Sequence, residues 1–211
     1  MFLFLLYTIG YSLTGVMAPG AITAATIAQG GRNRWAGSWI AVGHGILEIP
    51  LIFVLLFGLG TVLQTVAVRI VIGIFGGLFL LWLAVQMFRD IRRPTFDLKN
   101  APQTAGPLAT GFVLSATNPY FLLWWATGGL VLAQQAQGFG PTAVPLFAIV
   151  HWSLDLLWLT ILSMGAFHGA NLLGRRNQKI LMGFCAAALT SFGIVFVTGA
   201  VRLLAETEIP G

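Results

Sequence analysis

Two short patterns in the sequence pair a histidine with a carboxylate inside otherwise apolar stretches. Glu48 follows His44 by four residues, and Asp155 follows His151 at the same spacing. Residues at positions i and i+4 share one face of an α-helix, so each imidazole would lie beside its carboxylate. Both groups exchange protons, and both coordinate divalent transition metals. The two patterns therefore indicate proton or metal chemistry.

Three interpretations of these pairs remain open from the residues alone. In the first, each histidine only satisfies its acid and stiffens a helix bundle. In the second, the carboxylates relay protons while the protein alternates between inward-facing and outward-facing states. In the third, the two helices meet, and a divalent metal ion binds the side chains of His44, Glu48, His151 and Asp155.

The composition places these pairs in a lipid bilayer. Of the 211 residues, 57% are hydrophobic and only 8% are charged. The charged residues fall mostly between apolar runs of about 20 residues, which is the length of one helical crossing. Backbone groups in lipid must be paired within their own segment, which predicts an all-α polytopic bundle. A carboxylate at the bilayer centre costs roughly 2.5–3.5 kcal/mol, so Glu48 and Asp155 are expected to face protein rather than lipid.

The apolar runs predict six transmembrane helices in a single membrane domain. Their approximate boundaries are 3–28, 36–59, 66–88, 108–133, 142–167 and 180–204. A polar cytoplasmic linker at about 89–107 divides the chain into a first repeat at about 1–88 and a second at about 108–204. Each half has three crossings, so a duplicated half would enter the membrane in the opposite direction and form an inverted repeat.

The distribution of Lys and Arg predicts the orientation. Nine of the 11 basic residues fall on one side, at Arg32, Arg34, Arg89, Arg92, Arg93, Lys99, Arg175, Arg176 and Lys179. The other side carries Arg69 and Arg202. Positively charged loops stay in the cytoplasm, so both termini are expected outside it. The basic residues form no stripe along a polar face; the expected partner is therefore the bilayer and not a nucleic acid.

Two predicted crossings are interrupted near mid-membrane. Ala18-Pro19-Gly20 breaks the first, and Thr117-Asn118-Pro119 breaks its counterpart in the second half. Proline removes a backbone donor and clashes with the preceding turn, so both crossings are expected to be discontinuous helices. A helix N-terminus at such a break attracts anions. Candidate residues for binding a substrate carboxylate are Pro19, Gly20, Asn118 and Pro119.

Small residues and tryptophans bear on how the helices pack, and the absence of nucleotide-binding motifs bears on the energy source for transport. Small residues that allow close packing, within a subunit or in a homo-oligomer, recur at Gly73, Gly76, Gly77, Gly165 and Gly169. Three tryptophans either pack or line a substrate cavity, namely Trp124, Trp125 and Trp152. The sequence contains no ATP-binding Gly-x-x-x-x-Gly-Lys motif and no cofactor motif. We expect no cofactor, and we expect transport to draw on an ion gradient or a partner.

Motifs spread over essentially the whole chain carry a family resemblance. They are Gly15-Val-Met-Ala-Pro19-Gly20, Gly30-Gly31-Arg32, Gly43-His44-Gly-Ile-Leu-Glu48, Gly111 through Ser115, Asn118-Pro119-Tyr120 and Trp124-Trp125. With these motifs the chain resembles the LysE-type translocators, small amino-acid exporters with six helices. That family commonly has Pro-Gly-Pro in its first helix, and Ala21 stands here in place of the second proline. The resemblance implies a transporter in a prokaryotic plasma membrane rather than an enzyme.

The expected function is secondary export of an amino acid or a similar small zwitterion, coupled to a proton gradient. The substrate carboxylate would lie at the two breaks, and Glu48 and Asp155 would carry protons or hold the amino group. The alternative is export of a divalent metal ion through the two His-acid pairs. A membrane-embedded enzyme ranks below both, because the sequence has no long soluble loop and no recognisable nucleophile signature.

Overall fold

The computed structural model describes residues 1–18, 20–59, 65–93, 105–172 and 174–208. Every regular element in these ranges is a helix, which confirms the predicted all-α class. In chain order the elements are α1 (Phe2–Val16), α2 (Ala21–Gly30), α3 (Ala36–Val54), the π-helical turn η1 (Leu55–Leu59), α5 (Val66–Arg92), α6 (Pro107–Ala116), α7 (Pro119–Trp124), the π-helical turn η2 (Trp125–Gly129), α8 (Leu130–Gln137), α9 (Ala143–Leu172) and α10 (Arg175–Glu208).

Four helices in the described ranges, α3, α5, α9 and α10, are long and apolar enough to cross a membrane. α1 and α2 qualify together as a fifth span that bends by 78° at their junction. The remaining predicted crossing, at 108–133, is divided among α6, α7, η2 and the start of α8. The six-helix arrangement therefore stays a prediction, while the positions of the apolar segments agree with the helices.

Both predicted breaks are present in the described backbone. α1 ends at Val16 and α2 begins at Ala21, with Pro19 outside the described residues. α6 ends at Ala116, and α7 begins at Pro119. Proline is tolerated at the first position of a helix because the donor that it lacks has no partner within the helix there.

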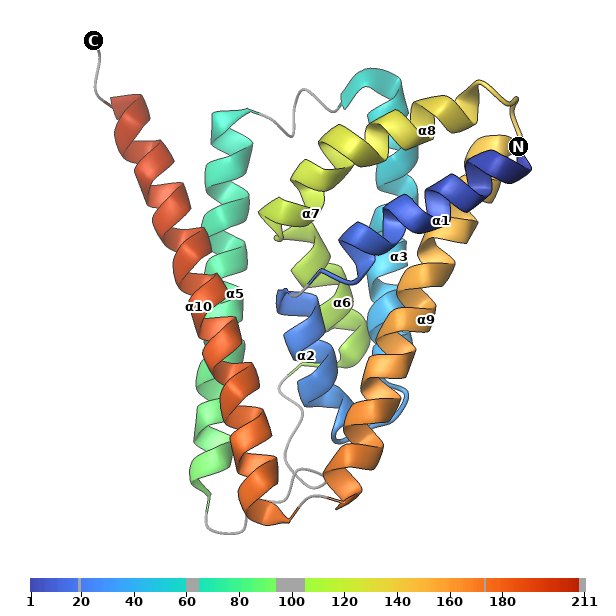
Figure 1. Cartoon of the computed structure of the whole chain (residues 1–211). Helices are drawn as coiled ribbons and strands as arrows, with labels where there is room; N and C mark the ends of the chain where they lie inside the picture. Colours follow the sequence, from blue (N-terminus) through green and yellow to red (C-terminus); the bar gives the residue numbers. More distant parts are fainter. Residues whose placement is uncertain (19, 60–64, 94–104, 173, 209–211) are drawn as a thin grey trace.

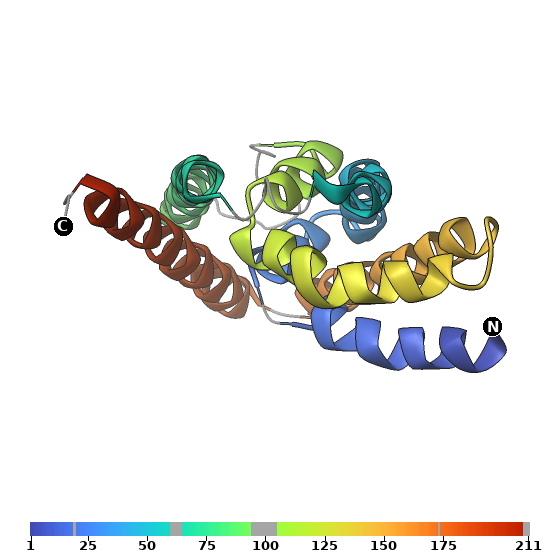
Figure 2. The same cartoon turned by 90° about the horizontal axis from the view of Figure 1, so that it is seen from above.

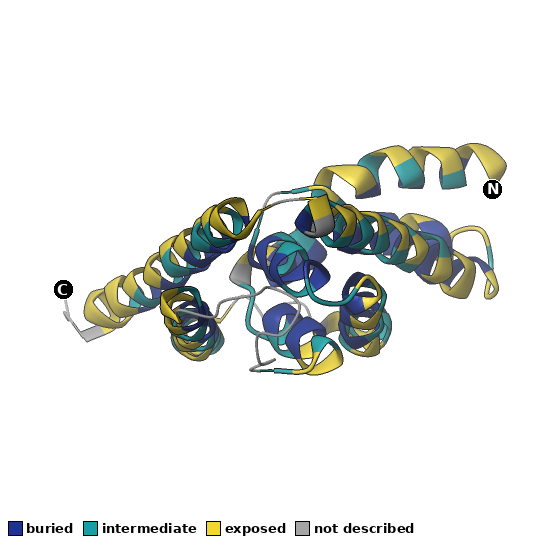
Figure 3. Cartoon of the chain, turned by 90° about the horizontal axis from the view of Figure 1, so that it is seen from below, coloured by how far each residue is buried: buried dark blue, intermediate teal, exposed yellow. Residues whose placement is uncertain are grey.

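The long helices form two groups around the short ones. α5 and α10 pack side by side on one flank, and α3 contacts both α6 and α9 on the other (Figures 1 and 2). Viewed from below, buried residues face the middle of the bundle and exposed residues face outward (Figure 3). The outward faces carry large apolar side chains such as Phe75 and Phe184, which are 65% and 75% exposed. Such faces are suited to contact with lipid tails.

Glycines set the close approach of α3 to its neighbours. A Cβ atom at Gly37 would overlap the backbone carbonyl of Leu159 on α9. A Cβ atom at Gly43 would overlap the carbonyl of Leu108 on α6, and one at Gly111 would overlap the carbonyl of Ile40. Hydrogen in place of a side chain lets helix backbones come together without a gap. This contact fixes which faces of α3 and α9 meet.

The small-residue positions differ in their use. Gly73 and Gly77 lie against α10, and Gly76 lies against Thr117. Gly165 and Gly169 on α9 have no described heavy atom within 4 Å of a Cβ built on them. The first group is thus engaged in packing within the chain, and the second forms an open face.

The α2–α3 turn, the C-terminal end of α5 and the N-terminal end of α10 lie at the same end of the molecule (Figure 1). These segments carry most of the basic residues that predicted the orientation; Lys99 is outside the described residues. At this end Arg32 forms a buried ion pair with Asp90 of α5, with 3.3 Å between Nη2 and Oδ2. Burial lowers the pKa of Arg32, and the charge of Asp90 acts in the opposite direction. The pair ties the α2–α3 turn to α5.

Candidate functional site

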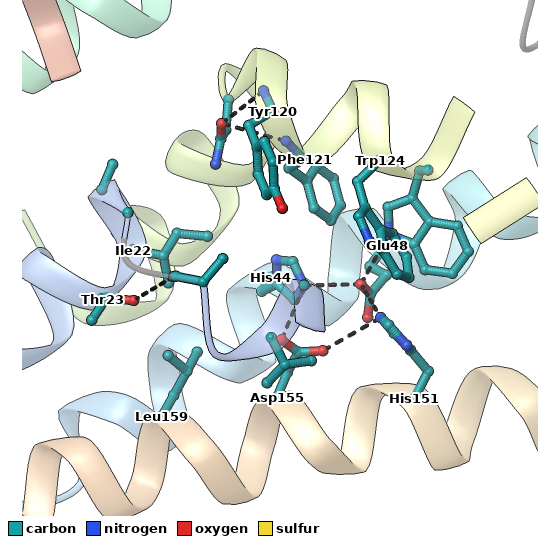
Figure 4. A pocket seen from close by; sticks show the side chains of 17 residues that line it. Ile22, Thr23, His44, Glu48, Tyr120, Phe121, Trp124, His151, Asp155 and Leu159 are labelled. Carbon is teal, nitrogen blue, oxygen red and sulfur yellow. Dashed lines mark hydrogen bonds and ion pairs between the residues drawn. The ribbon is translucent and has the colours of Figure 1, made fainter. Parts of the chain in front are cut away.

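The two His-acid pairs meet at the interface of α3 and α9. His44 and Glu48 project from α3, and His151 and Asp155 project from α9; all four are buried. His44 Nε2 lies 3.0 Å from Glu48 Oε1 and 3.9 Å from Asp155 Oδ1. His151 Nε2 lies 3.3 Å from Glu48 Oε1 and 3.7 Å from Asp155 Oδ2. Each imidazole therefore faces the carboxylate of its own helix and that of the other helix (Figure 4).

The other ring nitrogen of each histidine is held by a serine from a broken crossing. His44 Nδ1 lies 2.6 Å from Ser115 Oγ on α6, and His151 Nδ1 lies 2.7 Å from Ser12 Oγ on α1. Both serines are completely buried. Because one ring nitrogen is anchored, the other is directed at the carboxylates, as in sites where outer partners orient a histidine.

The two carboxylates differ in their partners. Trp125 Nε1 donates a hydrogen bond to Glu48 Oε1 at 3.2 Å. Glu48 Oε2 and Asp155 Oδ2 are buried and accept no hydrogen bond from the described residues. Buried polar atoms are nearly always hydrogen-bonded in native proteins, so an exception is an indication of a proton, an ion or a ligand.

A cavity of about 90 Å³ adjoins the cluster. Its lining includes all four cluster residues together with Gly20 and Asn118. Ile22 and Thr23 lie at one end of the cavity, and Glu48 lies at the other (Figure 4). Tyr120, Phe121 and Trp124 also line it, and no Lys or Arg occurs among its described lining residues. Among the described lining residues, the formal charges are therefore those of the cluster.

The two helix N-termini at the breaks have different surroundings. Asn118 caps α7, since its side-chain oxygen accepts hydrogen bonds from Tyr120 N at 3.0 Å and Phe121 N at 3.4 Å. α2 begins after Gly20 with no side-chain cap among the described residues. Four N-terminal amides of a helix lack intrahelical partners, so the α2 end keeps its capacity to bind an anion. Of the two ends, only α7 has a side-chain cap among the described residues.

Aromatic rings enclose the histidines. Trp124 stacks on His151 with 5.3 Å between ring centroids, and Phe121 packs edge-on against His44 at 4.9 Å. Trp125 is fully buried and lines the same cavity. Trp152 donates to the carbonyl of Ala41 at 2.8 Å and packs against Gly45, so it joins α9 to α3 instead of lining the cavity.

The structure thus brings together most of the residues singled out from the sequence. Gly20, Asn118 and the four cluster residues share one cavity, Pro119 begins α7, and Pro19 is outside the described residues. Sequence reasoning missed Ser12 and Ser115. The available signal was weak: each serine lies in an apolar run shortly before a break, and other hydroxyl residues such as Thr14 and Thr117 lie near it.

Helices with apolar outer faces and a buried titratable cluster next to a cavity define a polytopic membrane protein of the transporter class. The sequence profile of the LysE type translocator family matches residues 13–200, and the chain belongs to this family. It is an integral membrane protein, and the family's members are exporters.

A relative in Bacillus subtilis (strain 168) carries the name "Putative amino acid efflux protein YcgF". The two sequences are 27% identical over 211 residues, an alignment that covers 97% of this chain and 99% of the relative. No solved structure shows significant similarity to the chain.

Proposed function

We propose that this protein exports an amino acid or a similar small zwitterion, and that proton exchange at the His-acid cluster couples export to the proton gradient. The observation that carries the proposal is one cavity with two buried carboxylates at one end and, at the other, a helix N-terminus that has no side-chain cap among the described residues. The family and the name of the B. subtilis relative support the same substrate class.

The cavity is complementary to a zwitterion. The α2 N-terminus offers free amides and the positive end of the helix dipole to a carboxylate. Glu48 and Asp155 offer negative charge to an ammonium group. The volume of about 90 Å³ is well below the roughly 300–1,000 Å³ of pockets that hold drug-sized ligands, which favours a small substrate.

Coupling follows from competition for the same carboxylates. A proton bound to the cluster neutralises a carboxylate that would otherwise hold the substrate ammonium group. Intramembrane carboxylate and histidine groups form proton relays in transporters, because an isolated charge at this depth is costly. Proton binding from outside would therefore release the substrate, and proton loss to the cytoplasm would prepare the site for the next molecule.

We also propose that the two halves form an inverted repeat. The contacts support this by their cross-over pattern: His44 of the first half binds Ser115 of the second, and His151 of the second half binds Ser12 of the first. Helix pairs follow the same exchange, since α3 packs on α6, α9 packs on α1, and α5 packs on α10. A two-fold axis in the membrane plane would relate these contacts.

Transport by purified protein in liposomes tests the function. With a proton gradient imposed, wild-type protein should accumulate one or more small neutral amino acids. Glu48→Gln and Asp155→Asn remove charge and keep shape, so each should abolish gradient-driven accumulation and weaken substrate binding. Glu206→Gln, an exposed change on α10, is the matched control. Gradient-driven accumulation by the double carboxylate variant would refute the coupling role.

A further inference from the structure

The protonation of His44 is fixed by its serine. Ser115 has one hydroxyl hydrogen, and the hydroxyl donates it to the carbonyl of Gly111 at 2.6 Å. Ser115 Oγ must then accept from His44, so we assign the ring hydrogen to Nδ1. In the neutral ring, Nε2 presents a lone pair to Glu48 Oε1 at 3.0 Å. Two electron-pair donors at this distance need a cation between them, which is either a proton or a metal ion.

The spacing of the facing atoms matches one metal ion. A tetrahedral ion with ligands at 2.0–2.2 Å has ligand atoms about 3.4 Å apart. The four imidazole–carboxylate separations are 3.0, 3.3, 3.7 and 3.9 Å. One ligand atom each from His44, Glu48 and Asp155 lie within 4.8 Å of one another. His151 would supply the fourth ligand, and its Nε2 lies 3.3 Å from Glu48 Oε1 and 3.7 Å from Asp155 Oδ2.

The electrostatics favour a divalent ion. Two carboxylates and two neutral imidazoles carry a net charge of two negative units, which one divalent cation cancels in place of two protons. A buried group of zero net charge is far less costly in the membrane than two buried carboxylates that keep their charges. The buried Glu48 Oε2 and Asp155 Oδ2, which accept no hydrogen bond from described residues, are available to such an ion.

We propose that His44, Glu48, His151 and Asp155 bind one divalent transition-metal ion of the zinc type. Imidazole ligands select against Mg²⁺ and Ca²⁺, which prefer oxygen ligands and higher coordination numbers. Four protein ligands leave no open position, as in sites that hold an ion without activating water. The bound ion joins α3 to α9, and Ser115 and Ser12 are the outer partners that orient its imidazole ligands. The ion and the substrate ammonium group would use the same carboxylates, so bound metal would compete with the proposed amino-acid export.

Zinc titration of purified protein tests the site. The protein is prepared without a polyhistidine tag, stripped of metal and titrated calorimetrically with Zn²⁺ and, separately, Mg²⁺. We expect one Zn²⁺ per chain and no measurable Mg²⁺ binding. His44→Ala and Asp155→Asn should each abolish the one-to-one step. Ser115→Ala should weaken it by about 10–100-fold, the usual effect of removing an outer partner.

The control variants replace a histidine and a glutamate, as the test variants do, but at positions outside the site. His168→Ala on α9 and Glu206→Gln on α10 alter exposed residues and should bind Zn²⁺ as wild type does. Gel filtration and circular dichroism establish whether each variant is folded. If His44→Ala does not fold, the shape-conserving variant Glu48→Gln takes its place. No stoichiometric binding by wild type, or binding retained by folded Glu48→Gln/Asp155→Asn protein, overturns the proposal. Amino-acid export is measured in a separate assay with a chelator present. Failure of the export proposal can therefore be told apart from failure of the metal-binding proposal.

Discussion

Glu48 and Asp155 occupy matching positions in the two patterns but have unequal surroundings. Glu48 Oε1 faces both imidazoles and accepts from Trp125, whereas Asp155 faces the same imidazoles at longer distances. Replacement of Glu48 therefore disturbs more interactions than replacement of Asp155. This inequality is the reason to examine both single carboxylate variants and not only the pair.

The side-chain oxygen of Asn118 caps α7 by accepting hydrogen bonds from two backbone amides, and we infer that capping is the main role of this residue. We predict that Asn118→Ala lowers the free energy of unfolding by about 1 kcal/mol, the usual cost of losing a cap. Substrate affinity should change less than about twofold, because the α2 end remains intact. This is far smaller than the tenfold change that corresponds to about 1.4 kcal/mol.

Thermal melting in detergent and ligand binding to purified protein measure the two effects. Asn177→Ala is the control, because Asn177 is exposed near the start of α10. A large loss of substrate affinity in folded Asn118→Ala protein would instead place the substrate at the α7 end.

At the scale of helices, the site depends on how closely α3 packs on its neighbours. Gly37 touches the backbone of Leu159, which lies one turn beyond Asp155 on α9. A separation of the two helices would carry the His-acid pairs apart. Stability and site geometry are therefore coupled through the same contact.

We predict that Gly37→Ala lowers the free energy of unfolding by about 1–3 kcal/mol, because the added methyl group overlaps backbone that cannot move aside. Gly165→Ala on α9 meets open space and should be neutral, or stabilising by up to about 1 kcal/mol through helix propensity. Thermal melting of both variants, followed by Zn²⁺ titration, checks the coupling. Equal melting temperatures for the two variants would contradict the close-packing argument.

At the scale of the whole molecule, charge determines the proposed orientation in the membrane. The end that carries the α2–α3 turn and the start of α10 is rich in basic residues, and the opposite end carries the α8–α9 turn (Figure 1). Positive loops remain in the cytoplasm. We therefore propose that both termini lie outside it.

Single cysteines read out this orientation in a Cys185→Ala background. Arg176→Cys should react with an impermeant thiol reagent only after the cells are opened. Gln137→Cys, at the exposed end of α8, should react in intact cells. The reverse pattern would mean that the chain is inserted in the opposite direction.

The sequence by itself determined the features that depend on neighbours along the chain. Apolar run lengths located the helices, prolines located both breaks, and the i,i+4 spacing placed each histidine beside its acid. These signals are local because helix geometry and backbone pairing in lipid are satisfied within one segment. Hence the class and the four His and acid residues of the cavity were predictable.

Only the tertiary structure decided which helix faces meet. The contact of Gly37 with Leu159 brings the two His-acid pairs together, and packing of α1 and α6 supplies Ser12 and Ser115. Asn118 became a cap because its side chain turned back to its own helix. Rotation and approach of helices depend on surfaces distant in sequence, and periodicity within one helix carries no information about its partner.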